Sequence, residues 1–184
     1  AVEQARHIIA DSLGAEARNI CFTSGGTEAN NTLLLGAAEA LKRRGNRIIV
    51  SAVEHSSVYE SAKRLSTLGW DVQYAPVDAG GVVALDRLKA LLTDKTILVS
   101  IMTGNNETGA MYDIKRAFAM AKAKDPTIVT HTDAVQGYLK CRRFTPASIG
   151  ADLVTISAHK VHGPKGVGAL YINPALLKAK QIVP

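Results

Sequence analysis

Short runs rich in β-branched residues alternate along this chain with longer segments that carry apolar residues at helical spacing. The runs predict strands at residues 19–23, 47–52, 71–75, 97–103, 127–132, 152–157 and 167–172. The longer segments predict helices at residues 1–13, 28–44, 56–68, 85–92 and 113–124. Strands separated by helices form mainly parallel sheets that are covered by helices on both faces. We therefore expect an α/β fold with a mainly parallel sheet of about seven strands.

The length and composition indicate a single folded unit. The chain has 184 residues, of which 47% are hydrophobic and 21% are charged, and it contains no low-complexity tract, linker or internal repeat. A chain of about 150 residues already buries roughly 70% of its unfolded surface, so a substantial core is possible. Intrinsic disorder and fibrous repeats are excluded. We expect residues 1–184 to form one domain.

The charge, aromatic content and cysteine content limit which partners and which cellular compartment are expected. The net charge is +6, but most basic residues are scattered, and only three Phe, five Tyr and one Trp are available for stacking on bases. Neither nucleic-acid binding nor a membrane span is expected, since no apolar run approaches about 18 residues. Cys21 and Cys141 are too few for a disulfide framework. Two isolated thiols suit a reducing compartment, so we expect a cytoplasmic location.

Polar clusters follow almost every predicted strand. The clusters are Ser24-Gly25-Gly26-Thr27, Glu54-His55, Asn105-Asn106-Glu107, Asp133 with Gln136, and Ser157-Ala158-His159-Lys160. In open α/β sheets, ligands bind outside the carboxyl ends of the strands. The five clusters therefore predict one binding site along this edge of the sheet.

Two of these clusters have both a chemical and an ordinary structural explanation. Gly25 and Gly26 let backbone N–H groups approach an anion closely, and a helix N-terminus beside Thr27 favours a phosphate. Alternatively, Thr27 is only the N-cap of that helix. Lys160 lies at a strand end in a constrained polar turn, where an amine with a lowered pKa forms a Schiff base. Taken alone, it is more often a solvated surface lysine, which is how we interpret Lys165.

The remaining clusters supply a carboxylate, an amide and an imidazole. Asp133 follows a strand and shares a sheet face with His131, and its charge suits a protonated heteroaromatic nitrogen. Gln136 can donate to a ring oxygen, while His55 can stack on a ring and move protons. Each of these residues alone is more often structural. Together with the phosphate cradle and the lysine, they match the needs of pyridoxal phosphate (PLP).

At these residues the chain resembles the cysteine desulfurase branch of the class V aminotransferase-like, fold-type I PLP enzymes. The motifs that carry the resemblance, in the order of that family, are FTSGGTEANN, VEHSSV, ILVSIMTGNNETG, HTDAVQ and SAHKVHGPKGVGALYI. They run from Phe22 to Ile172 and cover most of the chain. The lysine-containing motif and NNETG are the most specific.

The resemblance implies a role for each matched residue. Lys160 would hold PLP as a Schiff base, Asp133 would pair with the pyridinium nitrogen, and His55 would stack on the ring and assist proton transfer. Gln136 and Asn106 would lie near the phenolic oxygen of the ring. The phosphate would be held by Gly26, Thr27, Ser157 and His159. No metal is expected.

The resemblance also implies an activity and partners. In the family, L-cysteine is converted to alanine while its sulfur passes to an enzyme cysteine as a persulfide, and then to acceptor or scaffold proteins for iron–sulfur clusters or thio-cofactors. Family members are homodimers of chains about twice this length. Neither Cys21 nor Cys141 matches the position of the nucleophile. We therefore expect this chain to be the PLP-binding large domain alone, without persulfide-forming activity of its own.

Four alternatives stay open. A selenocysteine lyase shares these motifs and the same cofactor chemistry. A nucleotide-binding α/β module would need a GxxxxGK[ST] or GxGxxG string, and neither occurs. A metal site could combine His159 and His162 with His131 and Asp133, although Gly163 and Pro164 oppose a regular helix there. Finally, the chain could serve only in assembly, with its exposed apolar surface associating with other copies.

Overall fold

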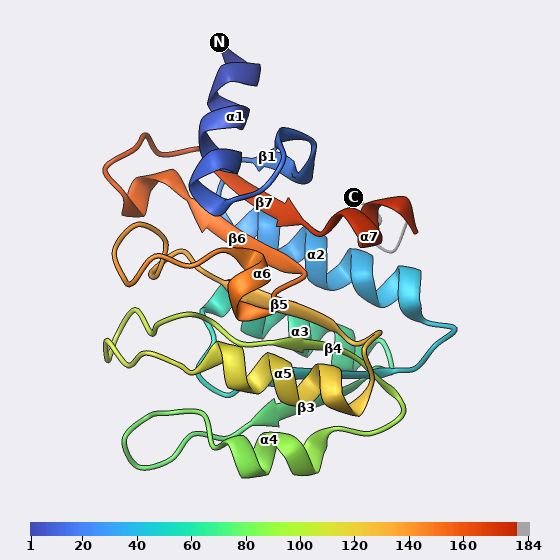
Figure 1. Cartoon of the computed structure of the whole chain (residues 1–184). Coiled ribbons are helices and arrows are strands. Elements are labelled where there is room, and N and C mark those ends of the chain that lie inside the picture. Colours follow the sequence, from blue (N-terminus) through green and yellow to red (C-terminus); the bar gives the residue numbers. More distant parts are fainter. Residues whose placement is uncertain (180–184) are drawn as a thin grey trace.

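A seven-stranded sheet forms the centre of the protein, in the order β1-β7-β6-β5-β4-β2-β3. The structure is a computed structural model that describes residues 1–179 (Figure 1). Its strands are β1 (Ile20–Thr23), β2 (Arg47–Ser51), β3 (Asp71–Ala75), β4 (Thr96–Ser100), β5 (Val129–Asp133), β6 (Leu153–Ser157) and β7 (Gly168–Ile172). Every pair from β3 to β6 is parallel, whereas β7 is antiparallel to both β6 and β1. The predicted mainly parallel seven-stranded sheet is confirmed.

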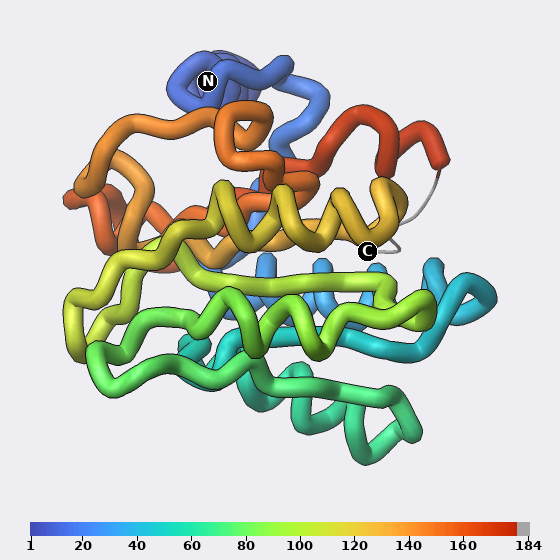
Figure 2. Tube along the Cα trace, turned by 60° about the horizontal axis from the view of Figure 1, so that its bottom comes forward, coloured from blue at the N-terminus to red at the C-terminus, as the bar shows by residue number. Residues whose placement is uncertain are grey.

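Helices cover both faces of this sheet, as Figures 1 and 2 show. The α-helices are α1 (Val2–Leu13), α2 (Gly26–Leu41), α3 (Ser56–Thr67), α4 (Leu85–Leu91), α5 (Ile114–Lys124), α6 (Pro146–Ile149) and α7 (Pro174–Lys178). Two short 3₁₀ helices, η1 (Ala17–Asn19) and η2 (Ala158–Lys160), precede β1 and follow β6. Within the described chain, no helix is long and apolar enough to cross a membrane.

Two apolar cores lie on opposite faces of the sheet, because alternate residues of a strand point to opposite faces. In β2, Ile48 and Val50 pack with residues of α2 and α3, whereas Ile49 packs with the core that contains Phe118 of α5. All three strand residues are buried, as expected for a parallel strand with helices on both sides. Because both faces of such a strand are buried under helices, nearly every residue of the strand is apolar in the sequence.

The strand order places a topological switch point between β2 and β4. The chain leaves β2 through α3 on one face of the sheet, and reaches β4 and β5 through α4 and α5 on the other. Connections that diverge in this way leave a crevice outside the carboxyl ends of the strands, where ligands of open α/β folds bind. The segments after β2, β4, β5 and β6 all reach this edge.

Most predicted bounds agree with the structure to within two residues, and two elements differ by three residues at one end. The strand predicted at 97–103 ends at Ser100. Beyond it, the backbone N–H groups of Ile101 and Thr103 still donate to β5, whereas that of Met102 donates to the Glu54 carboxylate over 2.8 Å. The helix predicted at 28–44 spans Gly26–Leu41. Its N-cap is Gly25, so the interpretation of Thr27 as the N-cap is wrong.

Candidate active site

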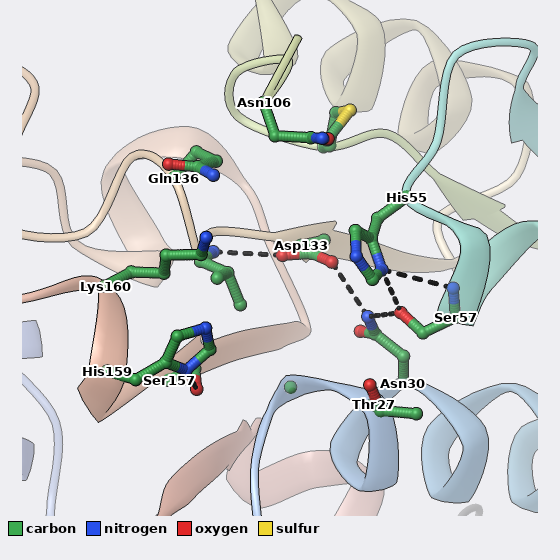
Figure 3. Close-up of a pocket in the computed structure, with 13 residues that line it drawn as sticks. Thr27, Asn30, His55, Ser57, Asn106, Asp133, Gln136, Ser157, His159 and Lys160 are labelled. Carbon is green, nitrogen blue, oxygen red and sulfur yellow. Dashed lines mark hydrogen bonds between the residues drawn. The ribbon is translucent and has the colours of Figure 1, made fainter. Parts of the chain in front are cut away.

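One hollow lies outside the carboxyl ends of β2, β4, β5 and β6, and five chain segments line it (Figure 3). The lining residues are Gly26, Thr27, Asn30, His55, Ser57, Met102, Asn106, Asp133, Val135, Gln136, Ser157, His159 and Lys160. Every site residue named from the sequence is among them. Lys160 and Asp133, in particular, face the same space.

The hollow has a buried floor and an exposed rim. Asn30, Ser57, Asp133 and Ser157 form the floor, and each has at most 8% of its surface exposed. The rim carries the solvent-exposed residues Thr27, His55, Asn106, His159 and Lys160. A ligand could therefore enter from the rim and meet the Asp133 carboxylate at the bottom.

The first turn of α2 forms one wall, and Gly26 sets how closely this wall approaches. A Cβ atom at Gly26 would lie 2.8 Å from Cγ2 of Val135, which is closer than real side chains approach. The absence of a side chain at Gly26 thus lets the helix N-terminus lie against the turn after β5. The free N–H groups of a first helical turn and the hydroxyl of Thr27 are suitable donors for an anion.

Asp133 ends β5, and two hydrogen bonds hold its carboxylate. The backbone N–H of Val135 donates to Oδ1 over 3.0 Å, and Nδ2 of Asn30 donates to Oδ2 over 2.8 Å. Burial raises the pKa of Asp133, while these two donors and the nearby His55 act in the opposite direction. A cation in the hollow would favour its ionised form further.

Lys160 ends the η2 helix directly after β6 and projects from the rim over the hollow (Figure 3). The dashed line that ends beside its amine in Figure 3 is the hydrogen bond from the Val135 backbone N–H to Asp133, and not a bond of Lys160. Among residues 1–179, Lys160 forms no salt bridge, although eight such pairs occur there. Its amine is therefore available for a covalent or ionic bond to a ligand. Lys165 is exposed and lies outside the hollow, as predicted.

His55 faces Lys160 from the opposite side of the hollow and caps α3 (Figure 3). Its Nδ1 atom accepts a hydrogen bond from the backbone N–H of Ser57 over 3.2 Å and lies 2.9 Å from the Ser57 hydroxyl. Ser57 thus fixes the imidazole at Nδ1, while Nε2 points away from Ser57.

The other predicted residues occupy the walls. Ser157 Oγ and His159 Nδ1 are 2.8 Å apart, so these two side chains orient one another beside the first turn of α2. The amide oxygen of Gln136 accepts a hydrogen bond from Lys140 over 2.5 Å, which leaves its NH₂ group to act as a donor. Asn106 closes the hollow from the loop after β4 (Figure 3).

Sequence reasoning missed four lining residues, namely Asn30, Ser57, Met102 and Val135. Asn30 lies three positions after Thr27 on the same helix, so the i, i+3 spacing places both on one face. Ser57 lies two positions after His55 at a helix start, where serine hydroxyls often bond nearby backbone groups. Met102 and Val135 are apolar and carry no sequence signal of a site.

The hollow is not lined by six residues of the predicted clusters, namely Ser24, Gly25, Glu54, Asn105, Glu107 and Ala158. Glu54 is buried beneath it, where its Oε1 accepts from the Ser51 hydroxyl over 2.6 Å and from the Met102 N–H. Burial raises the pKa of Glu54 to about 8, and the charge of Asp133 adds to the effect. Asn105 builds the loop instead, since its side chain accepts from the backbone of Glu107 and donates to that of Val53.

His131 is a buried structural residue. Its ring nitrogens lie 2.8 Å from the Ser100 hydroxyl and 3.2 Å from the Thr155 hydroxyl, and burial lowers its pKa to about 3. It takes no part in the hollow. Within the part of the chain that the structure describes, no three His, Cys, Asp or Glu side chains are grouped so that they could hold a metal ion.

The arrangement provides an amine, a buried carboxylate and an imidazole around one hollow, with an anion-binding helix N-terminus at its wall. An amine in such a site forms Schiff bases with carbonyl compounds. A carboxylate at the floor stabilises positive charge on the bound molecule. These groups suit a flat, phosphorylated, aldehyde-bearing ligand.

The chain is similar in sequence to known proteins. Residues 1–183 match the family model described as aminotransferase class V. Cysteine desulfurase IscS from Dictyoglomus turgidum is 48% identical over 175 residues, which cover 94% of this chain and 43% of that protein. The chain therefore spans less than half the length of this relative.

Solved structures show the same fold. A structure titled "NifS-like protein" has a TM-score of 0.90 and 41% identity, and the match covers 94% of this chain and 47% of that one. A structure titled "SspA in complex with cysteine" has a TM-score of 0.89 and 36% identity, and the match covers all of this chain and 51% of that one.

Proposed function

Because the chain belongs to the aminotransferase class V family, we propose that it is the cofactor-binding large domain of a PLP-dependent cysteine desulfurase. One observation carries the proposal above the others: Lys160, Asp133 and His55 line a single hollow. The relatives named cysteine desulfurase support the choice of reaction.

The residues of the hollow fit PLP. An ionised carboxylate has about four lone-pair positions, and Asp133 uses two of them within the described chain. Its remaining positions suit the N–H of a protonated pyridine ring. Gly26 and the open first turn of α2 suit the phosphate, and Lys160 suits the aldehyde.

When bound, PLP supplies an electron sink for the substrate carbon next to the amino group. Lys160 would hold the cofactor covalently through its amine. Asp133 would keep the ring nitrogen protonated, and His55 would pack against the ring. Gln136 and Asn106 would contact the phenolic oxygen, while the phosphate would be held by Gly26, Thr27, Ser157 and His159.

The proposed substrate is L-cysteine, and the proposed product is L-alanine with the sulfur retained as a persulfide on an enzyme cysteine. The solved relative in complex with cysteine supports this substrate. Cys21 is exposed on β1, and neither it nor Cys141 lines the hollow. We therefore place the nucleophilic cysteine outside these 184 residues.

We further propose that the whole protein is a homodimer that passes sulfur to an acceptor or scaffold protein. A cytoplasmic location is supported by the two cysteines, both of which are unpaired, because a reducing compartment keeps thiols free.

Titration of the chain with PLP tests the cofactor assignment. We expect a visible absorption band of the lysine-bound cofactor in the wild type and in Lys165→Ala, the matched control. The band should be lost in Lys160→Ala. A band of equal intensity in Lys160→Ala, or none in the wild type and in the whole protein, would contradict the proposal.

A further inference from the structure

A continuous chain of hydrogen bonds joins the Asp133 carboxylate to the His55 imidazole through two floor residues (Figure 3). Nδ2 of Asn30 lies 2.8 Å from Asp133 Oδ2 and 2.9 Å from the Ser57 hydroxyl. The Ser57 hydroxyl lies 2.9 Å from Nδ1 of His55. Asn30 is fully buried, and Ser57 is 8% exposed.

The chemistry of the groups fixes the direction of each bond. The NH₂ group of Asn30 has two hydrogens, and the two acceptors within reach are Asp133 Oδ2 and Ser57 Oγ. In the structure Nδ2, and not the amide oxygen, is the Asn30 atom that faces both acceptors. Since Ser57 Oγ accepts from Asn30, its own hydrogen is directed to His55.

The backbone provides a second, independent constraint on His55. The N–H of Ser57 points at Nδ1 over 3.2 Å, and a backbone N–H can only donate. Two donors therefore converge on Nδ1, which must carry a lone pair. A neutral imidazole with a lone pair on Nδ1 has its proton on Nε2.

We propose that Asn30 and Ser57 are positioning residues that hold neutral His55 in the Nε2–H form. The Nε2–H group then faces the ligand side of the ring, because Ser57 occupies the opposite side. A bound molecule meets a hydrogen-bond donor at this point, which favours an acceptor oxygen over an ammonium group. This consequence for the ligand rests on the proposed function, whereas the position of the proton does not.

Nitrogen NMR of the chain labelled with ¹⁵N-histidine tests the position of the proton. Long-range ¹H–¹⁵N correlations distinguish a protonated from an unprotonated ring nitrogen, at a pH where the imidazole is neutral. The His55 signals are assigned by their loss in His55→Gln. We expect an unprotonated Nδ1 and a protonated Nε2 in the wild type, a measurement that needs no variant at Asn30 or Ser57.

Ser57→Ala tests the contribution of the hydroxyl, and Ser56→Ala is the matched control on an exposed neighbour. In Ser57→Ala one of the two donors to Nδ1 is lost, so the Nδ1 resonance should move towards that of a nitrogen without hydrogen bonds. It should stay unchanged in Ser56→Ala. A protonated Nδ1 in the wild type, or an Nδ1 resonance that Ser57→Ala leaves unmoved, would overturn the proposal.

This experiment is independent of the cofactor assignment. If the wild type has the Nε2–H form but forms no lysine-bound PLP, the positioning role stands and the proposed function fails. If PLP binds to Lys160 while Nδ1 carries the proton, the proposed function stands and the positioning role fails.

Discussion

Asn30 donates a hydrogen bond to Asp133 over 2.8 Å, from the first turns of α2 to the end of β5, and both side chains are buried. Residues 103 positions apart in the sequence thus share one bond at the floor of the hollow. The carboxylate proposed to face the cofactor is held in place before any ligand binds.

Replacement of Asn30 by Ala should destabilise the chain because it leaves the buried Asp133 carboxylate with one donor fewer. The expected loss in the free energy of unfolding is about 1–3 kcal/mol. Asn46→Ala, at an exposed position, is the matched control. Chemical denaturation measures both variants, and equal stabilities would show that the Asn30–Asp133 bond contributes nothing.

Glu54 should make the stability of the chain depend on pH. Its pKa is raised by burial from 4.5 to about 8, so between these values the folded chain holds a proton that the unfolded chain releases. The Glu54 contribution to the free energy of unfolding is therefore full below pH 4.5 and is lost as the pH rises through about 8.

Comparison of the wild type with Glu54→Gln isolates this effect. The glutamine keeps an oxygen that can accept from Ser51 and Met102, but it does not titrate. We expect the wild-type stability to fall relative to the variant as the pH rises through this window, by at most about 1.4 kcal/mol per pH unit. If the free energies of unfolding of the wild type and Glu54→Gln changed with pH in the same way, the raised pKa of Glu54 would be refuted.

Gly26 should contribute to PLP binding, because a Cβ atom there would push against Val135, whose N–H bonds to Asp133. Overpacking of this kind costs about 1–3 kcal/mol, which corresponds to a loss of PLP affinity of about 5- to 150-fold in Gly26→Ala. Gly25→Ala is the control, since the nearest atom to its Cβ would be Ser157 Oγ at 3.9 Å. Fluorescence titration with PLP measures both affinities. Equal affinities would contradict the account.

Much of the fold could be predicted from the sequence because each strand is a short apolar run and each main helix has an apolar stripe. The position of the site at one edge of the sheet could also be predicted, because polar side chains that follow parallel strands meet at the same edge. For that reason Lys160, Asp133 and His55 were placed together although 105 positions separate the first from the last in the sequence.

Other features depend on tertiary contacts that no local pattern reveals. Glu54 and His55 are adjacent, and only the packing of the β2–α3 loop decides that one is buried while the other lines the hollow. The helices α6 and α7 have four and five residues, which is too short for a periodic pattern. Their caps, Thr145-Pro146 and Asn173-Pro174, were the available signals.

Borohydride reduction in the presence of PLP, followed by peptide mapping, tests the central claim most directly because it identifies the amine that the cofactor modifies. The account predicts a stable pyridoxyl group on Lys160, carried by the peptide that follows β6. A pyridoxyl group found instead on another lysine, such as Lys140 beside Gln136, would contradict it.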